Sequence, residues 1–137
     1  MGVRSFFDTN VLVYTDDKAD PSKQLRSLEL VASHRRSRTG VISLQVLQEY
    51  FVTVTRKLQV DAVVARRKVE LLAECDVVAP ELADVLAAID LHRLHRINFW
   101  DALIVRSAKE AGCAVLLTED MQNSREIDGV RIVNPFL

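Results

Sequence analysis

Four carboxylates occupy positions where folding would gather them in one place. Asp8 directly follows a short apolar run, and Asp120 comes two residues after another. Glu49 and Asp101 lie in the first turns of expected helices, at or beside the apolar face. Taken singly, each has a simpler explanation: a turn or helix cap, an exposed helix position, a place near a helix N-terminus, or a loop. Taken together, they indicate one acidic cluster.

Such a cluster would carry out metal chemistry. Neighbouring carboxylates repel one another, and their pKa values rise unless a cation lies between them. Mg²⁺ and Mn²⁺ prefer oxygen ligands, so we predict Asp8, Glu49, Asp101 and Asp120 as metal ligands. A bound ion lowers the pKa of a water molecule and neutralises charge on a phosphate, which suits phosphodiester hydrolysis. The four carboxylates could hold one ion or two.

The elements that would position these residues alternate along the chain. Strands are expected at residues 3–7, 40–42, 76–79, 114–118 and 130–133, the last as a candidate edge strand. Helices are expected at residues 21–36, 44–57, 62–73, 80–94 and 99–111. Strands separated by helices pair in parallel through right-handed crossovers. We therefore predict an α/β fold with three α/β/α layers around a mainly parallel sheet of four to five strands, which would bind its ligand at the carboxyl ends of the strands.

Length and composition are typical of one soluble domain. The chain has 137 residues, 49% of them hydrophobic, and no linker or repeat, so residues 1–137 are expected to form a single domain. The formal net charge of −1 means that any nucleic-acid surface must be local. Cys75 and Cys113 lack metal-ligand spacing and are expected to be reduced, although a disulfide stays open. The sequence shows no signal peptide and no membrane span, which favours a cytoplasmic location.

Four short motifs carry a family resemblance. They read FFDTNVLVY around Asp8, SLQVLQEY around Glu49, FWDALIV around Asp101 and LLTEDM around Asp120. In order and spacing they resemble the motifs of PIN-domain nucleases, along nearly the whole chain. The closest likeness is to the VapC-like toxins of toxin–antitoxin pairs.

The resemblance implies an activity and partners. It implies a Mg²⁺- or Mn²⁺-dependent endoribonuclease that acts on structured RNA such as tRNA or rRNA. It also implies a homodimer, inhibited by a cognate antitoxin protein whose C-terminal segment covers the site.

The resemblance also ranks the site residues. Asp8 and Asp101 would be the firmest metal ligands, Glu49 the third and Asp120 the most variable. Asn10 and Thr118 would orient side chains or water. One departure is that Met121 follows Asp120 where relatives often have another acidic residue, so Glu119 could share the role of Asp120.

Three basic clusters could hold RNA phosphates. They lie at residues 35–38, 66–68 and 92–96, and each could equally be the solvated face of a helix. Arg93 and Arg96 are the best candidates for substrate binding because they precede the helix that carries Asp101. His92 and His95 have helical spacing for a metal but lack a third ligand nearby.

Other functions fit less well. A dehalogenase-type phosphatase needs a second aspartate where Asn10 stands, and a receiver domain needs a lysine after the strand at 130–133. A PIN-like module that binds RNA or protein without cleaving remains the alternative. The presence of all four acidic residues favours the enzyme.

Overall fold

One twisted sheet organises the chain. The computed structural model describes residues 2–137; Met1, which the single-domain prediction includes, lies outside the described residues. The strands are β1 (Ser5–Phe7), β2 (Gly40–Ser43), β3 (Asp76–Val78), β4 (Val115–Leu117), β5 (Glu126–Ile127) and β6 (Val130–Val133). Their order is β3-β2-β1-β4-β6-β5, and every pair is parallel except the β5–β6 hairpin.

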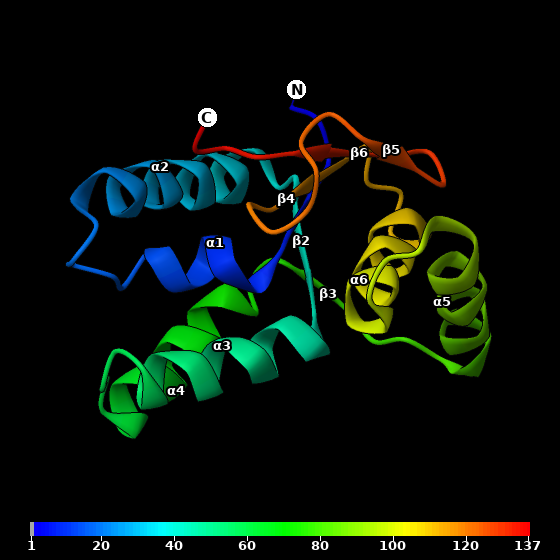
Figure 1. Ribbon diagram of the computed structural model, residues 1–137. Coiled ribbons are helices and arrows are strands. Elements are labelled where there is room, and N and C mark those ends of the chain that lie inside the picture. Colours follow the sequence, from blue (N-terminus) through cyan, green and yellow to red (C-terminus); the bar gives the residue numbers. More distant parts are fainter. Residues whose placement is uncertain (1) are drawn as a thin grey trace.

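Helices cover both faces of this sheet. They are α1 (Thr9–Tyr14), α2 (Pro21–Ser37), α3 (Leu44–Arg56), α4 (Ala62–Leu72), α5 (Leu82–His95) and α6 (Phe99–Glu110). Figure 1 shows α5 and α6 as a pair on one side of the sheet and α1 to α4 on the other. Because both faces are covered, the central strands are mostly apolar, and Phe6, Phe7, Val41 and Ile42 are all buried. The predicted three-layer α/β architecture is confirmed.

The sheet differs from the prediction at one edge. It has six strands because residues 126–127, too short for a sequence pattern, pair with β6 through a turn at Asp128 and Gly129. The strand at 130–133 is therefore interior, between β4 and β5, and is not an edge strand. Gly129 has φ +83, the left-handed conformation that favours glycine and tightens this turn.

Two helix predictions need correction. Residues 9–14 form the short helix α1, which the sequence does not predict because six residues are too few to show a helical period. Helix α5 begins at Leu82 and not at Pro80, because Glu81 and Asp84 form a capping box that fixes the N-terminus two residues later. The side chains of Asp20, Ser43, Asp61 and Asn98 accept backbone N–H groups at the N-termini of α2, α3, α4 and α6.

Within residues 2–137, no helix is long and apolar enough to cross a membrane. The two cysteines are unpaired, with Cys113 buried and Cys75 partly exposed.

Candidate active site at the carboxyl edge of the sheet

Asp8 lies at the junction of β1 and α1 and is almost completely buried, with 5% of its surface exposed. It caps α1, because its Oδ1 accepts the backbone N–H of Thr9 at 2.7 Å. Its Oδ2 accepts the Thr118 hydroxyl at 2.8 Å. The simple explanation of Asp8 as a helix cap is thus correct, but the cap also places a carboxylate inside the molecule at the strand edge.

Asn10 and Thr118 connect Asp8 to Asp120. The Asn10 Oδ1 accepts the backbone N–H of Glu119 at 3.2 Å, which orients the amide. Its Nδ2 then donates to Asp120 Oδ2 at 2.9 Å and to Asp8 Oδ2 at 3.3 Å. The Thr118 oxygen accepts the backbone N–H of Asp120 at 3.1 Å. Asn10 therefore contacts the side chains of both Asp8 and Asp120, whereas Thr118 contacts the side chain of Asp8 and the backbone of Asp120.

Glu49 and Asp101 complete the cluster from two helices. Glu49 is exposed, and its Oε1 accepts the Thr9 hydroxyl at 3.2 Å and the Gln45 amide at 3.1 Å. Asp101 lies in the first turn of α6 and is partly buried. Among residues 2–137, Glu49 forms no ion pair with a lysine, arginine or histidine.

The four carboxylates lie close enough for their charges to affect one another's pKa values. Burial raises the pKa of Asp8 to about 6, and the charges of Asp101 and Asp120 add to the rise. Burial also raises the pKa of Asp101, with the charges of Asp120 and Glu49 as further causes. The structure thus brings Asp8, Glu49, Asp101 and Asp120 together, as the sequence predicts.

The donor set suits a hard divalent cation. In the described part of the chain, no lysine, arginine or histidine forms an ion pair with any of the four carboxylates. The Asn10 amide, which is uncharged, donates hydrogen bonds to both Asp8 and Asp120. No three acidic, histidine or cysteine side chains of residues 2–137 already form a closed metal site. The residues fit a metal through their oxygen chemistry and unbalanced charge, and the carboxylates would have to close around it.

Glu119 does not belong to this cluster. Its two oxygens accept the Tyr14 hydroxyl at 2.5 Å and the Lys23 ammonium at 2.8 Å. The sequence pattern left this role open. The sequence does not single out Tyr14 or Lys23 as partners of Glu119, because they lie far from it in the chain and no periodicity links them to it.

A groove of about 610 Å³ adjoins the carboxylates between α1 and α3. Asn10, Glu49 and Asp120 line one part, and apolar side chains such as Val13 and Val52 line another. The site therefore opens to a channel that an extended ligand could enter.

The basic clusters lie in different places. Arg93 is in the last turn of α5, and Arg96 ends that helix in a left-handed conformation with φ 55. Both are exposed, and neither forms an ion pair with another described residue. They lie at the connection to α6, five and eight residues before Asp101, and remain the best phosphate-binding candidates.

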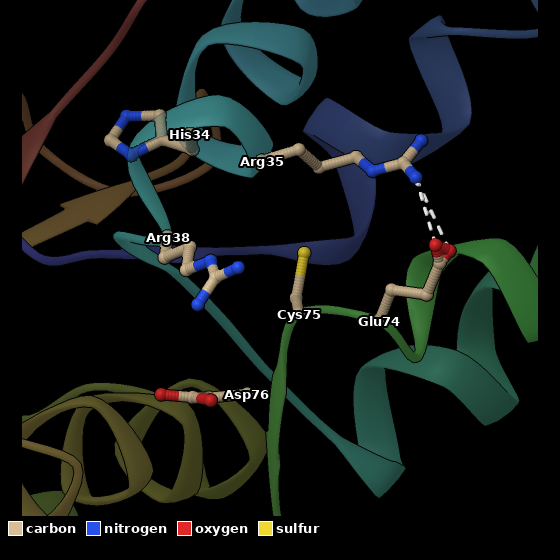
Figure 2. A pocket seen from close by; sticks show the side chains of 7 residues that line it. His34, Arg35, Arg38, Glu74, Cys75 and Asp76 are labelled. Carbon is tan, nitrogen blue, oxygen red and sulfur yellow. Dashed lines mark hydrogen bonds and ion pairs between the residues drawn. The ribbon is translucent and has the colours of Figure 1, made fainter.

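The other two clusters are engaged elsewhere. Arg66 and Arg67 both pair with Glu70, and Lys68 turns inward to Asp16 at 2.8 Å. The cluster at 35–38 borders a pocket of about 400 Å³ where β2 and β3 begin, at the amino edge of the sheet. Figure 2 shows Arg35 bonded to Glu74 there. Because the carboxylates lie at the opposite edge, this cluster is not part of the site.

The histidine pair shows no metal geometry. The His92 Nδ1 contacts the carbonyl oxygen of Ile97 at 2.5 Å, and no third ligand stands nearby among the described residues. This agrees with the interpretation of the two histidines as helix-surface residues.

Comparison with known proteins gives both a family and a set of structural neighbours. No curated protein matches the chain in sequence. A chain of a toxin–antitoxin complex from Klebsiella pneumoniae is 19% identical, with a TM-score of 0.69 over 96% of this chain and 97% of its own. VapC20 of Mycobacterium tuberculosis, described as a toxin that cleaves the sarcin–ricin loop, is 20% identical, with a TM-score of 0.68 over 82% and 86%.

A third neighbour comes from Rickettsia felis, in VapBC2 bound to a promoter DNA fragment. It is 21% identical, with a TM-score of 0.66 over 93% and 96% of the two chains. At these identities the likeness shows a shared fold. The PIN domain family model matches residues 5–128, a range that contains all four carboxylates. The chain therefore belongs to the PIN domain family.

Proposed function

We propose that the protein is a metal-dependent endoribonuclease that hydrolyses RNA phosphodiester bonds, with Mg²⁺ or Mn²⁺ as its cofactor. The observation that supports this most strongly is a buried carboxylate, Asp8, that feels the charges of Asp101 and Asp120 and has no cationic partner among the described residues. A cap role uses one oxygen of Asp8, but burying an ionised carboxylate is costly unless a cation lies nearby. The alternative of a PIN-like module that binds RNA or protein without cleaving has no specific observation in its favour.

The mechanism assigns each residue a task. Asp8, Asp101 and Glu49 would hold the metal, and Asp120 would be a fourth ligand or act on a second ion. A bound metal supplies an activated water and neutralises charge on the phosphate. Thr118 and Asn10 fix the oxygens of Asp8 and Asp120, which prepares the ligand geometry before substrate arrives. Arg93 and Arg96 would bind phosphates beyond the acidic cleft.

We further propose that the protein is the toxin of a toxin–antitoxin pair. Such toxins are held inactive by an antitoxin protein, and this structure has a surface suited to one. An apolar groove of about 730 Å³ lies between α3 and α4, lined by Leu47, Phe51 and Val63 among others. Gln48 and Val52 line both this groove and the one beside the carboxylates. One peptide could therefore anchor in the apolar groove and extend across the site.

Self-association is part of the same proposal. Leu82, Leu86 and Ile89 are 73%, 54% and 39% exposed, and their spacing places them on one face of α5. A second copy that packs on this stripe would give a homodimer, and a solution mass of a single chain would contradict it. The proposed activity needs access to cellular RNA, in agreement with the cytoplasmic location expected from the sequence.

Expression in a bacterial host tests the toxin proposal. We expect growth arrest together with discrete RNA fragments, and relief of both when the protein encoded by the adjacent reading frame is co-expressed. Val63 is an apolar residue whose side chain is 78% exposed, so Val63→Glu should not disturb the fold. The variant should still arrest growth, but co-expression of the adjacent reading frame should no longer relieve that arrest. Normal growth at full expression, with intact RNA, would contradict the proposal.

A further inference from the structure

We propose that Lys23, Tyr14 and Glu119 form a lock that positions the segment carrying Asp120 for metal binding, with Glu119 as a positioning residue and not a ligand. This inference rests on the proposed function. The three residues come from α2, α1 and the loop after β4, and no sequence motif joins them.

The first step is that Glu119 is fully engaged. Its side chain is 20% exposed and that of Lys23 is 33% exposed, so the ion pair at 2.8 Å is partly shielded from water. The Tyr14 hydroxyl donates to the other oxygen, and Lys23 also donates to the Tyr14 hydroxyl at 3.3 Å. Charge-assisted hydrogen bonds to both oxygens make this contact stronger than an exposed ion pair. Each oxygen of Glu119 therefore already has a partner within the lock.

The second step is that Lys23 is itself held. Its ammonium lies 4.9 Å from the centre of the Tyr14 ring and 5.4 Å from that of Phe136. The two rings pack edge to face with centres 5.1 Å apart. Cation–π contacts of this kind add to the ion pair and restrict the lysine to one position. The lock thus joins α1, α2, the C-terminal residues and the loop after β4.

The third step connects the lock to the site. The backbone N–H of Glu119 donates to Asn10 Oδ1, and the Asn10 amide contacts both Asp8 and Asp120. Asn10 and Tyr14 are four residues apart on α1, so both face the same loop segment. Movement of Glu119 would rotate Asn10 and displace Asp120 from Asp8. The lock therefore acts on the ligands through Asn10 and the backbone.

Three conservative variants test this inference. Lys23→Met keeps the aliphatic stem over the rings, Tyr14→Phe removes one hydroxyl, and Glu119→Gln removes one charge. Lys109→Met is the matched control, because it breaks an ion pair of similar length, 2.7 Å to Asp128, that makes no contact with the site. Two quantities are measured on full-length protein without RNA: Mn²⁺ affinity by calorimetry, and amide hydrogen exchange at residues 119 and 120.

We expect Lys23→Met and Glu119→Gln to weaken Mn²⁺ binding about tenfold and to speed exchange of both amides. Tyr14→Phe should show the same changes to a smaller degree, and Lys109→Met should match wild type. Cleavage should recover at high Mn²⁺ with an unchanged KM for RNA.

Other outcomes would overturn the inference. One is amide exchange in Lys23→Met at the wild-type rate, and another is tighter Mn²⁺ binding in Lys23→Met, which releases Glu119. A third is loss of Mn²⁺ binding in Glu119→Gln while Lys23→Met retains it, because Glu119 would then be a ligand. Wild-type protein that binds no Mn²⁺ would instead contradict the proposed function, and amide exchange would still decide whether the lock positions this segment.

Discussion

Asp101→Asn should abolish RNA cleavage without harming the fold. The Asp101 side chain forms no hydrogen bond or ion pair with another described residue, so the substitution breaks no native contact. It removes a negative charge that repels Asp120 and Glu49. Loss of a metal ligand should cost about 4 kcal/mol of transition-state stabilisation, which is about 10³-fold in rate. Metal-free Asp101→Asn should therefore be as stable as wild type or more stable, yet inactive.

The measurement compares purified proteins on total RNA with Mg²⁺, with Mn²⁺ and with a chelator, together with their midpoints of thermal unfolding. Asp90→Asn is the control, because Asp90 is an exposed acidic residue on α5. Wild-type protein should cleave only with metal, and Asp90→Asn should match it. Cleavage by Asp101→Asn at the wild-type rate would contradict the account. Equal RNA binding with no cleavage by any protein would favour the inactive module.

Metal-free protein should become less stable as the pH rises from about 4 to 6. The pKa of Asp8 is about 6 in the folded state against 3.8 for an ordinary aspartate, so the folded state binds more protons in this interval. By linkage, the stability present at low pH is lost as the pH rises through the folded pKa, by about 3 kcal/mol for Asp8. The raised pKa of Asp101 acts in the same direction. Above the folded pKa of Asp8 its contribution is constant.

Chemical unfolding of wild type and Asp8→Asn across pH 4–8 checks this, because the difference between the two proteins removes the contributions of other groups. The stability of Asp8→Asn should decline less with rising pH. Mn²⁺ binds the ionised carboxylates, so it should stabilise wild type more at pH 7 than at pH 5. Parallel pH profiles for the two proteins, with or without Mn²⁺, would show that Asp8 is neither desolvated nor a metal ligand.

Much of the fold could be predicted because its signals are local. A cap such as Asn98 or Ser43 is followed at once by the helix it starts, and a buried strand such as β4 is a continuous apolar run. The two misjudged regions lack such signals. Helix α1 has six residues and β5 has two, too few to show a period.

The proximity of the four carboxylates was predictable, but the hydrogen bonds that connect them to the rest of the fold were not. Asp8, Glu49, Asp101 and Asp120 follow from strand ends, helix starts and the motifs around them. The contact between Asn10 and Glu119 spans 109 residues, and that between Lys23 and Glu119 spans 96. Such pairs depend on tertiary packing, which propensity and periodicity do not encode. Lys68 shows the same limit, since its sequence suggests an exposed cluster but its ammonium bonds Asp16.

The most direct test of the central claim is an anomalous difference map from crystals grown with Mn²⁺. The account predicts a peak bounded by the carboxylate oxygens of Asp8 and Asp101, with Glu49 in or next to the coordination shell. The same crystals of Asp101→Asn should show a weaker peak or none. A peak elsewhere on the molecule, or no peak at Mn²⁺ concentrations that support RNA cleavage, would contradict the four-carboxylate site.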